Sequence, residues 1–400
     1  MRPSWLLLGP AFVAAIAYVD PGNVAANVSA GAQFGFLLVW VIVVANVMAG
    51  LVQYLSAKLG LVTGRSLPEA VADHTRTRTR IAYWLQAEFV AMATDLAEVV
   101  GGAIALYLLF DLPLLHGGVI TGLVSLLLLA VQNRRGQQMF ERVISGLLLV
   151  IAIGFLTSLF VEAPPAAAVA DGLIPRFEGA ESILLATAML GATVMPHAVY
   201  LHSGLARDRH GHPEPGPTRR MLLRVTRIDV GLAMLVAGAV NLAMLLVAAT
   251  NLQGRDDTDS IEGAHAAVAD TLGPTVALLF AIGLLASGLA STSVGAYAGA
   301  MIMQGLLHRT YPLLLRRLVT LIPALAVLAI GVDPSRVLVL SQVVLSFGIP
   351  FALIPLVRLT SNKSLMGDDA NHRVTTALGW MVAGVITVLN VVLIYLTVTG

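Results

Sequence analysis

A pair of cation-binding side chains flanks a proline and a glycine near the N-terminus, in the tetrapeptide Asp20-Pro21-Gly22-Asn23. The Asp20 carboxylate and the Asn23 amide supply hard oxygen ligands three residues apart. Proline removes a backbone donor and glycine adds backbone freedom, so we expect a helix to break at this point. A break also frees backbone carbonyls, for which Ala17 is a candidate. Oxygen ligands of these kinds alone would suit Mg²⁺ or Ca²⁺.

A second break is predicted at Met195-Pro196-His197, where a thioether directly precedes the proline. Ala192 is the candidate for a freed carbonyl at this break. Adding a thioether to hard oxygens shifts the preference of a site toward softer transition metals. The chain has no cysteine, so disulfides and thiolate metal sites are excluded. A set without thiolates or a histidine cage does not indicate zinc trapping, and a transported ion must also leave.

Titratable side chains that could carry protons accompany the two breaks. Glu88, Asp95 and Glu98 lie in one apolar segment, within about an 80° arc of a helix that turns about 100° per residue. Acid chains of this kind inside a membrane are typical of proton relays. His197 and His202 follow the second break and can titrate near neutral pH.

Three arginines near the ends of apolar segments could pair with these acids: Arg209, Arg316 and Arg317. They could equally be ordinary basic residues at the cytoplasmic face of a membrane protein. The sequence leaves both interpretations open.

The composition indicates that these residues lie in a membrane. Hydrophobic residues make up 57% of the 400-residue chain and charged residues 12%, against about 25% charged in a typical soluble domain. A soluble fold must expose much of its surface to water and cannot hide so much apolar area. The lipid bilayer is therefore the expected solvent. The net charge of +1 and the lack of a basic cluster with aromatics indicate no nucleic-acid partner, and no obligate protein partner is inferred.

Eleven segments reach the length of about 20 largely apolar residues that a membrane helix needs. They cover residues 4–32, 35–59, 81–109, 116–132, 139–161, 180–205, 226–250, 272–306, 313–331, 335–358 and 374–398. The runs are continuous rather than alternating, which predicts an all-α integral membrane protein.

The basic residues orient these spans. With the N-terminus inside, 21 of the 24 Lys and Arg residues fall on the cytoplasmic side, beginning with Arg2. Only Arg176, Arg255 and Arg336 fall outside. Cytoplasmic loops carry an excess of Lys and Arg, so we predict a cytoplasmic N-terminus and, after eleven spans, an external C-terminus.

The two breaks fall at corresponding places of a repeated architecture. The first break lies in span 1 and the second in span 6, which opens a second block of five spans. Because five is odd, the second block inserts with inverted topology. Paired interrupted helices in inverted repeats are the best sequence indication of a transporter binding site. The sequence therefore predicts repeats over residues 1–162 and 178–359, followed by an eleventh span within 372–400.

The two breaks resemble the paired signatures of the Nramp family of divalent-metal transporters, in particular its bacterial MntH-like members. Three further stretches are similar to that family: Thr63-Gly64-Arg65-Ser66-Leu67-Pro68-Glu69, Asp95-Leu96-Ala97-Glu98 and Tyr200-Leu201-His202-Ser203. Either break alone would be suggestive, whereas both at this separation are highly specific.

The resemblance implies a LeuT-like fold in the plasma membrane of a bacterium. It implies a proton-coupled importer, not an enzyme, that carries Mn²⁺, with Fe²⁺, Co²⁺ and Cd²⁺ as alternatives, by alternating access and without a resident cofactor. The implied metal ligands are Asp20, Asn23, Met195, the carbonyls of Ala17 and Ala192, and in some states Gln342. The implied proton-handling residues are Asp20, Asp95, Glu98 and His197.

The sequence offers three alternative functions. A sodium-coupled amino-acid transporter of the same fold would present free amides to a substrate carboxylate, which the Asp20 anion would repel. An intramembrane enzyme is disfavoured because the chain contains no HExxH motif and no nucleophile–base pair. A passive metal channel stays open, although paired breaks favour alternating access.

Overall fold

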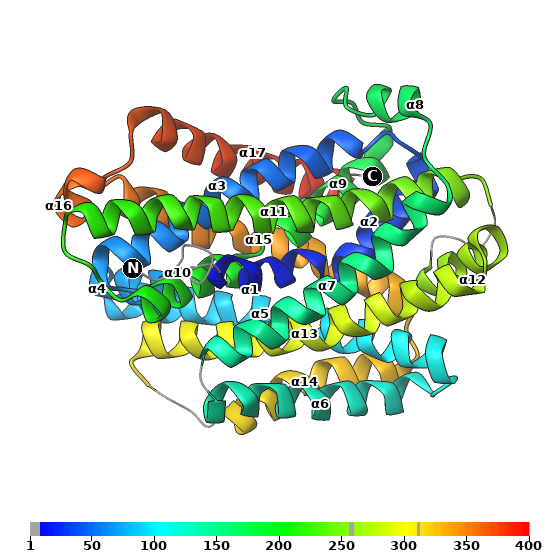
Figure 1. Cartoon of the computed structure of the whole chain (residues 1–400), viewed down its shortest axis with the longest axis horizontal. Coiled ribbons are helices and arrows are strands. Elements are labelled where there is room, and N and C mark those ends of the chain that lie inside the picture. The colour runs from blue at the N-terminus through cyan, green and yellow to red at the C-terminus, as the bar shows by residue number, and fades with distance from the viewer. Residues whose placement is uncertain (1–8, 136, 256–259, 310–312, 400) are drawn as a thin grey trace.

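The computed structural model of the chain describes residues 9–135, 137–255, 260–309 and 313–399. Arg2 and the first residues of the predicted span 4–32 lie outside the described residues. Within them the protein is helical and contains no strand. Figure 1 shows the long helices lying roughly side by side, with α6 and α14 at one edge of the bundle and α17 at the opposite edge.

Seven helices and one 3₁₀ turn form the first half of the chain. They are α1 (Pro10–Ile16), η2 (Ala17–Val19), α2 (Pro21–Phe34), α3 (Val39–Thr63), α4 (Leu67–Asp73), α5 (Thr77–Phe110), α6 (Leu114–Arg135) and α7 (Gln137–Val161). The second half continues with α8 (Ala166–Asp171), α9 (Gly179–Thr193), α10 (Pro196–His210), α11 (Pro217–Asn251), α12 (Ile261–Leu272), α13 (Pro274–Leu307), α14 (Leu313–Ile330), α15 (Pro334–Thr360), α16 (Lys363–Met366), η3 (Gly367–Asp369) and α17 (Arg373–Thr399).

A helical segment occupies each of the eleven predicted ranges, which confirms the all-α class. Eight segments of the described chain are long and apolar enough to cross a membrane: α3, α5, α7, α9 with α10, α11, α13, α15 and α17. The apolar segments Pro10–Val19 and Leu114–Leu128 are shorter. The number of eleven crossings therefore stays a prediction.

Small residues let the central helices approach closely. A Cβ atom added to Gly288 of α13 would lie 3.0 Å from the backbone nitrogen of Gly102 in α5. A Cβ atom added to Gly60 of α3 would lie 1.9 Å from the Ser203 carbonyl oxygen in α10. Such contacts are the usual basis of helix packing in membranes, where van der Waals contact replaces the hydrophobic driving force.

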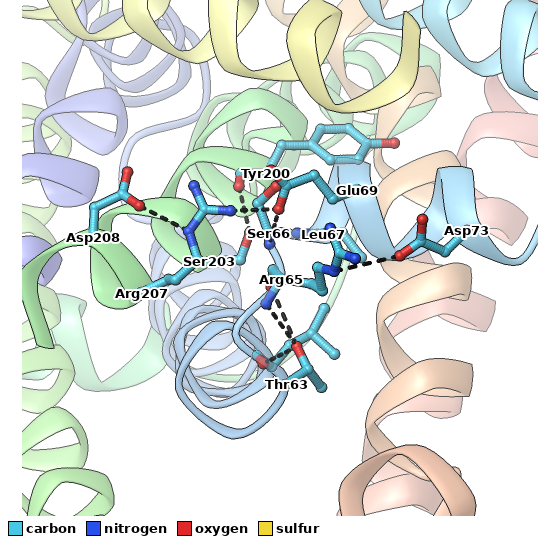
Figure 2. Close-up of polar contacts among 11 residues, drawn as sticks. Thr63, Arg65, Ser66, Leu67, Glu69, Asp73, Tyr200, Ser203, Arg207 and Asp208 are labelled. Carbon is cyan, nitrogen blue, oxygen red and sulfur yellow. Dashed lines mark hydrogen bonds and ion pairs between the residues drawn. The ribbon is translucent and has the colours of Figure 1, made fainter. Parts of the chain in front are cut away.

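The stretch 63–69 joins α3 to α4, and its α4 residues contact α10, as Figure 2 shows. The Leu67 backbone nitrogen donates to Ser203 Oγ at 2.7 Å, and Arg207 forms an ion pair with Glu69. The Ser66 backbone nitrogen donates to the same Glu69 carboxylate at 2.8 Å, at the first turn of α4. The family-like stretches 63–69 and 200–203 are thus in contact with each other. This contact holds the part of α10 that is far from the break.

Candidate metal site at two helix breaks

The first predicted break is confirmed. The 3₁₀ turn η2 ends at Val19, Asp20 is extended (φ −71°, ψ 168°), and α2 begins at Pro21. Asp20 Oδ1 accepts from the Asn23 backbone nitrogen at 2.8 Å and from Asn23 Nδ2 at 2.7 Å. Asp20 therefore caps α2 while it is fully buried, so its charge lies within the protein rather than in water.

The second predicted break is also confirmed. Helix α9 ends at Thr193, Met195 is extended (φ −65°, ψ 125°), and α10 begins at Pro196. Asn23 Nδ2 donates across the bundle to the Ala192 carbonyl at 3.0 Å, so the two breaks are in direct contact. Met195 is fully buried and lies three residues after Ala192.

The broken helices create a site with favourable polarity for a cation. The last carbonyls of a helix carry partial negative charge, and both η2 and α9 end at this place. Ala17 belongs to η2 and Ala192 to the last turn of α9. Discontinuous helices with such ends are the usual way in which transporters bind cations at membrane depth.

A third helix completes the cluster. Gln342 of α15 is fully buried, and its Nε2 lies 3.4 Å from Asp20 Oδ2. A Cβ atom added to Gly22 would lie 1.7 Å from the same Nε2 atom, so glycine is needed for Gln342 to reach the break. A Cβ atom added to Gly101 of α5 would lie 2.0 Å from Pro21 Cβ, so α5 also approaches through a glycine.

Two oxygens of this cluster lack hydrogen-bond partners among the described residues. Asn23 Oδ1 and Gln342 Oε1 are both buried and accept no hydrogen bond there. Buried polar atoms without partners are uncommon, and each one needs an explanation. Both are hard oxygen acceptors on residues that contact the Asp20 carboxylate, which is the kind of ligand set that a divalent cation requires.

The cluster is not a conventional metal cage. The described residues contain no group of three or more His, Cys, Asp or Glu side chains that could hold a metal. The groups in contact here are instead one carboxylate, two amides and the Ala192 carbonyl. One formal negative charge leaves a bound dication only partly neutralised, a combination suited to release as well as binding.

Two residues that the sequence reasoning missed stabilise the first break. Asn241 Nδ2 of α11 donates to the Tyr18 carbonyl at 2.7 Å, and Ser287 Oγ of α13 donates to the Val19 carbonyl at 2.5 Å. Carbonyls freed at membrane depth must be satisfied by protein or water. An asparagine inside the apolar segment 226–250 was the available signal, because such side chains usually bond between helices.

The structure brings the predicted acids of α5 together with two of the three predicted arginines. Arg317 Nη1 lies 2.5 Å from Asp95 Oδ1, with both side chains almost fully buried. Arg316 Nη2 lies 3.0 Å from Glu88 Oε1. Glu98 is buried, and its Oε2 lacks a hydrogen-bond partner among the described residues. The pairing interpretation of Arg316 and Arg317 is therefore confirmed.

The other predicted proton-handling residues have different surroundings. His197 lies in the first turn of α10, with its Nδ1 3.4 Å from Thr94 Oγ1 of α5, one residue before Asp95. His202 contacts α3 instead, where its Nδ1 lies 2.7 Å from Gln53 Oε1. The structure thus joins His197 to the acidic helix and places His202 in a separate contact.

Arg209 lies in a contact that closes the end of α1. Asp229 of α11 accepts from the Gly9 and Ala11 backbone nitrogens at 3.1 and 3.0 Å, which caps α1. Arg209 lies 3.6 Å from the Glu141 carboxylate of α7. A Cβ atom added to Gly9 would lie 2.8 Å from the same carboxylate, so these groups pack directly against the start of α1.

A polar pocket lies near the ends of α2 and α9 that are far from the two breaks. It measures about 330 Å³ and is lined by α2, α9 and α15, the three helices that contribute Asn23, Ala192 and Gln342. Ser29, Glu181 and Asp333 are among its lining residues. The pocket and the capped end of α1 therefore flank the site along the bundle.

Apolar helices that surround two facing helix breaks define a multi-pass membrane protein with a LeuT-like fold. Two solved structures share this fold at low identity. MhsT in complex with L-phenylalanine matches 97% of this chain and 98% of its own, with a TM-score of 0.58 and 13% identity. Mhp1 in a closed conformation matches 96% of this chain and 90% of its own, with a TM-score of 0.61 and 15% identity.

The chain belongs to the Nramp family, because the family model described as natural resistance-associated macrophage protein-like matches residues 11–396. The divalent metal cation transporter MntH of Mycobacterium tuberculosis (strain H37Rv) is 73% identical over 400 residues, which are 100% of this chain and 94% of the relative. MntH of Bacillus subtilis is 47% identical over 389 residues, which are 97% and 91% of the two chains. The crystal structure of a manganese transporter from Eremococcus coleocola covers 98% of this chain and 87% of its own, with a TM-score of 0.87 and 32% identity.

Proposed function

We propose that this protein imports divalent transition metals, Mn²⁺ above all, across the plasma membrane together with protons. The observation that carries the proposal is the cluster at the two breaks, where unpartnered Asn23 Oδ1 and Gln342 Oε1 lie on residues that contact the buried Asp20. The names of its relatives, divalent metal cation transporters and a manganese transporter, support the substrate class. Fe²⁺, Co²⁺ and Cd²⁺ are the other proposed substrates.

Each proposed ligand has a defined role. Asp20 supplies the only full negative charge, and Asn23 and Gln342 supply neutral oxygens. Ala17 in η2 and Ala192 in the last turn of α9 supply backbone carbonyls. Met195 supplies the soft ligand that favours transition metals over Ca²⁺ and Mg²⁺.

The path of the metal follows the proposed inverted repeats, residues 1–162 and 178–359. The polar pocket between α2, α9 and α15 supports entry from the predicted outer side. The cap that Asp229 forms on α1 supports a closed cytoplasmic side in this conformation. Transport then requires α1 to separate from Asp229, which would open the same site to the cytoplasm.

Protons are proposed to follow a separate route along α5, although their movement is coupled to that of the metal. Asp20 lies at the break, and Glu98 is buried on α5, which approaches the break at Gly101. Asp95 and Glu88 pair with arginines of α14. Acid chains that face protein inside a membrane are typical of proton relays. His197 is proposed to act between Asp20 and this chain of acids.

Metal uptake into proteoliposomes with a pH gradient tests this function. We expect Mn²⁺ uptake to accelerate when the outside is acidified, with acidification of the lumen in parallel. Mg²⁺ and Ca²⁺ at the same concentration should enter poorly.

Glu98→Gln is the matched variant for the proton part of this test. It should reduce proton entry more than Mn²⁺ binding, because it keeps the shape of the side chain and removes its titration. Unchanged proton entry in this variant would remove Glu98 from the route. Absence of any metal uptake by the wild type would contradict the whole proposal.

Replacement of Met195 by alanine tests the origin of selectivity. Without the thioether the site retains only hard oxygens, so Ca²⁺ should compete with Mn²⁺ uptake much more strongly, while part of the Mn²⁺ flux remains. Competition curves in proteoliposomes measure this change. Met189→Ala, another buried methionine of the same broken helix, is the control and should leave the competition unchanged. If Met195→Ala excludes Ca²⁺ as well as the wild type, the thioether is not the filter.

A further inference from the structure

An apolar crevice of about 460 Å³ lies between α3, α9 and α17, away from the proposed metal site. Its walls include Trp40 and Met48 of α3, Leu190 of α9, and Gly384 and Val388 of α17. No polar surface lines it. Val388 is 60% exposed, so the crevice opens to the surroundings of the bundle rather than into its core.

The crevice lies on the membrane-facing surface of three apolar helices, so hydrocarbon is the solvent that reaches it. Water does not stably occupy a site without polar partners. An empty crevice would leave its lining atoms without the dispersion contacts that packed interiors have. The molecules able to fill it are therefore apolar ones in the bilayer.

The two ends of the crevice differ. At one end Trp40 stacks edge-on against Phe177, with ring centroids 5.4 Å apart, and its indole nitrogen donates to the Arg176 carbonyl at 3.3 Å. Tryptophan with one wet and one apolar side is typical of the membrane–water interface. From Trp40 to Met48 the wall follows α3 for about 12 Å, which runs from that interface toward the bilayer interior.

We propose that this crevice binds one acyl chain of a phospholipid, with the headgroup at the Trp40 end. The body of the crevice is apolar along its whole lining, as an acyl chain requires, and its Trp40 end lies beside the polar backbone of Arg176, where a headgroup can lie. A second copy of the chain is the alternative occupant, and the test below separates the two. The crevice has the wet end and the apolar body that a phospholipid requires.

The crevice also connects the bilayer to the broken helix α9. Ala186 and Leu190 of α9 line it, and Ala192 follows in the last turn of the same helix, where its carbonyl accepts from Asn23. The bound chain would thus contact a helix that ends at the metal site. Binding itself does not depend on the function proposed for that site.

Gly384 provides a specific way to close the crevice. A Cβ atom added to it meets no atom within 4 Å, so a larger side chain can occupy the space without a clash. Gly231 of α11 is also exposed and also has open space around an added Cβ atom, and it does not line the crevice. Gly231→Phe is therefore a matched control for Gly384→Phe.

The test uses the full chain in detergent and a phospholipid with brominated acyl chains, which quench tryptophan on contact. The difference in fluorescence between the wild type and Trp40→Phe isolates the signal of Trp40. We expect quenching of Trp40 that saturates at one phospholipid per chain. Gly384→Phe should abolish the saturable quenching, and Gly231→Phe should preserve it.

Quenching that never saturates, or that is the same in Gly384→Phe and in the wild type, would overturn the proposal. A dimer that Gly384→Phe dissociates, without any saturable quenching in the wild type, would also overturn it. If Gly384→Phe does not fold, Gly384→Leu replaces it. Native mass spectrometry of the wild type then decides, because one retained phospholipid per chain supports the site and none contradicts it.

Discussion

We expect that replacing Asp20 with asparagine will abolish Mn²⁺ uptake in proteoliposomes but leave the protein folded. Asparagine caps a helix about as well as aspartate, so the hydrogen bond from the Asn23 backbone nitrogen to position 20 can be kept. The variant removes the only carboxylate among the proposed ligands. Even outer partners of metal ligands change affinity by about 10–100-fold, so loss of the charged ligand should reduce uptake by at least about 100-fold.

Asp20→Ala separates the charge from the cap. It should lose uptake to the same extent, and it should also unfold more easily, because loss of an N-cap costs about 1 kcal/mol. Uptake assays and thermal unfolding of both variants in detergent distinguish the two effects. Uptake that persists in both variants would show that the metal binds elsewhere, and uptake that persists in Asp20→Asn alone would show that the charge at position 20 is not required.

Replacing Arg317 with alanine should destabilise the protein by about 3–5 kcal/mol, because it leaves the Asp95 carboxylate buried without its partner. Arg317 is only 1% exposed, and the Asp95 side chain that remains in the variant is almost as deeply buried. Unfolding in detergent, followed by tryptophan fluorescence, measures the loss.

Two further variants test whether the buried ion pair causes this loss of stability. Arg317→Met combined with Asp95→Leu removes both charges and should recover most of the stability, since an apolar pair can replace a buried ion pair. Arg176→Ala breaks the exposed ion pair with Asp171 and should have little effect, because exposed pairs contribute little. If Arg317→Ala is as stable as Arg176→Ala, the buried pair does not stabilise the fold.

Both helix breaks could be predicted from the sequence because their causes are local. Proline and glycine act on their own backbone, and Asp20 and Asn23 are close in the chain. The contact of Asn23 with Ala192 joins residues 169 positions apart, and that of Gln342 with Asp20 joins residues 322 apart. The pairing of the two breaks followed from the inverted repeats, whereas Gln342 was suggested only by the family resemblance.

Other features needed the packing of the helices. The sequence could not show whether Arg316 and Arg317 pair with acids. Their ion pairs with Glu88 and Asp95 are seen only in the structure. The sequence does not distinguish His197 from His202. Because they lie five residues apart in α10, they lie on different sides of that helix, and His202 contacts α3.

The number of membrane crossings is less certain to follow from helix length than the helical class is. Eight segments of the described chain meet the length criterion, whereas the apolar segments Pro10–Val19 and Leu114–Leu128 are shorter, so the eleven crossings stay a prediction.

The close approach of Gly22 to Gln342 and of Gly101 to Pro21 has an evolutionary consequence. A Cβ atom at Gly101 would press on the Pro21 ring, and one at Gly22 would displace the Gln342 side chain from Asp20, so substitution at either glycine should disturb the site. Met195 and Gln342 contribute to the proposed site through their side chains. Descendants of this protein that prefer a different metal should therefore differ in those two side chains, on a frame that stays the same.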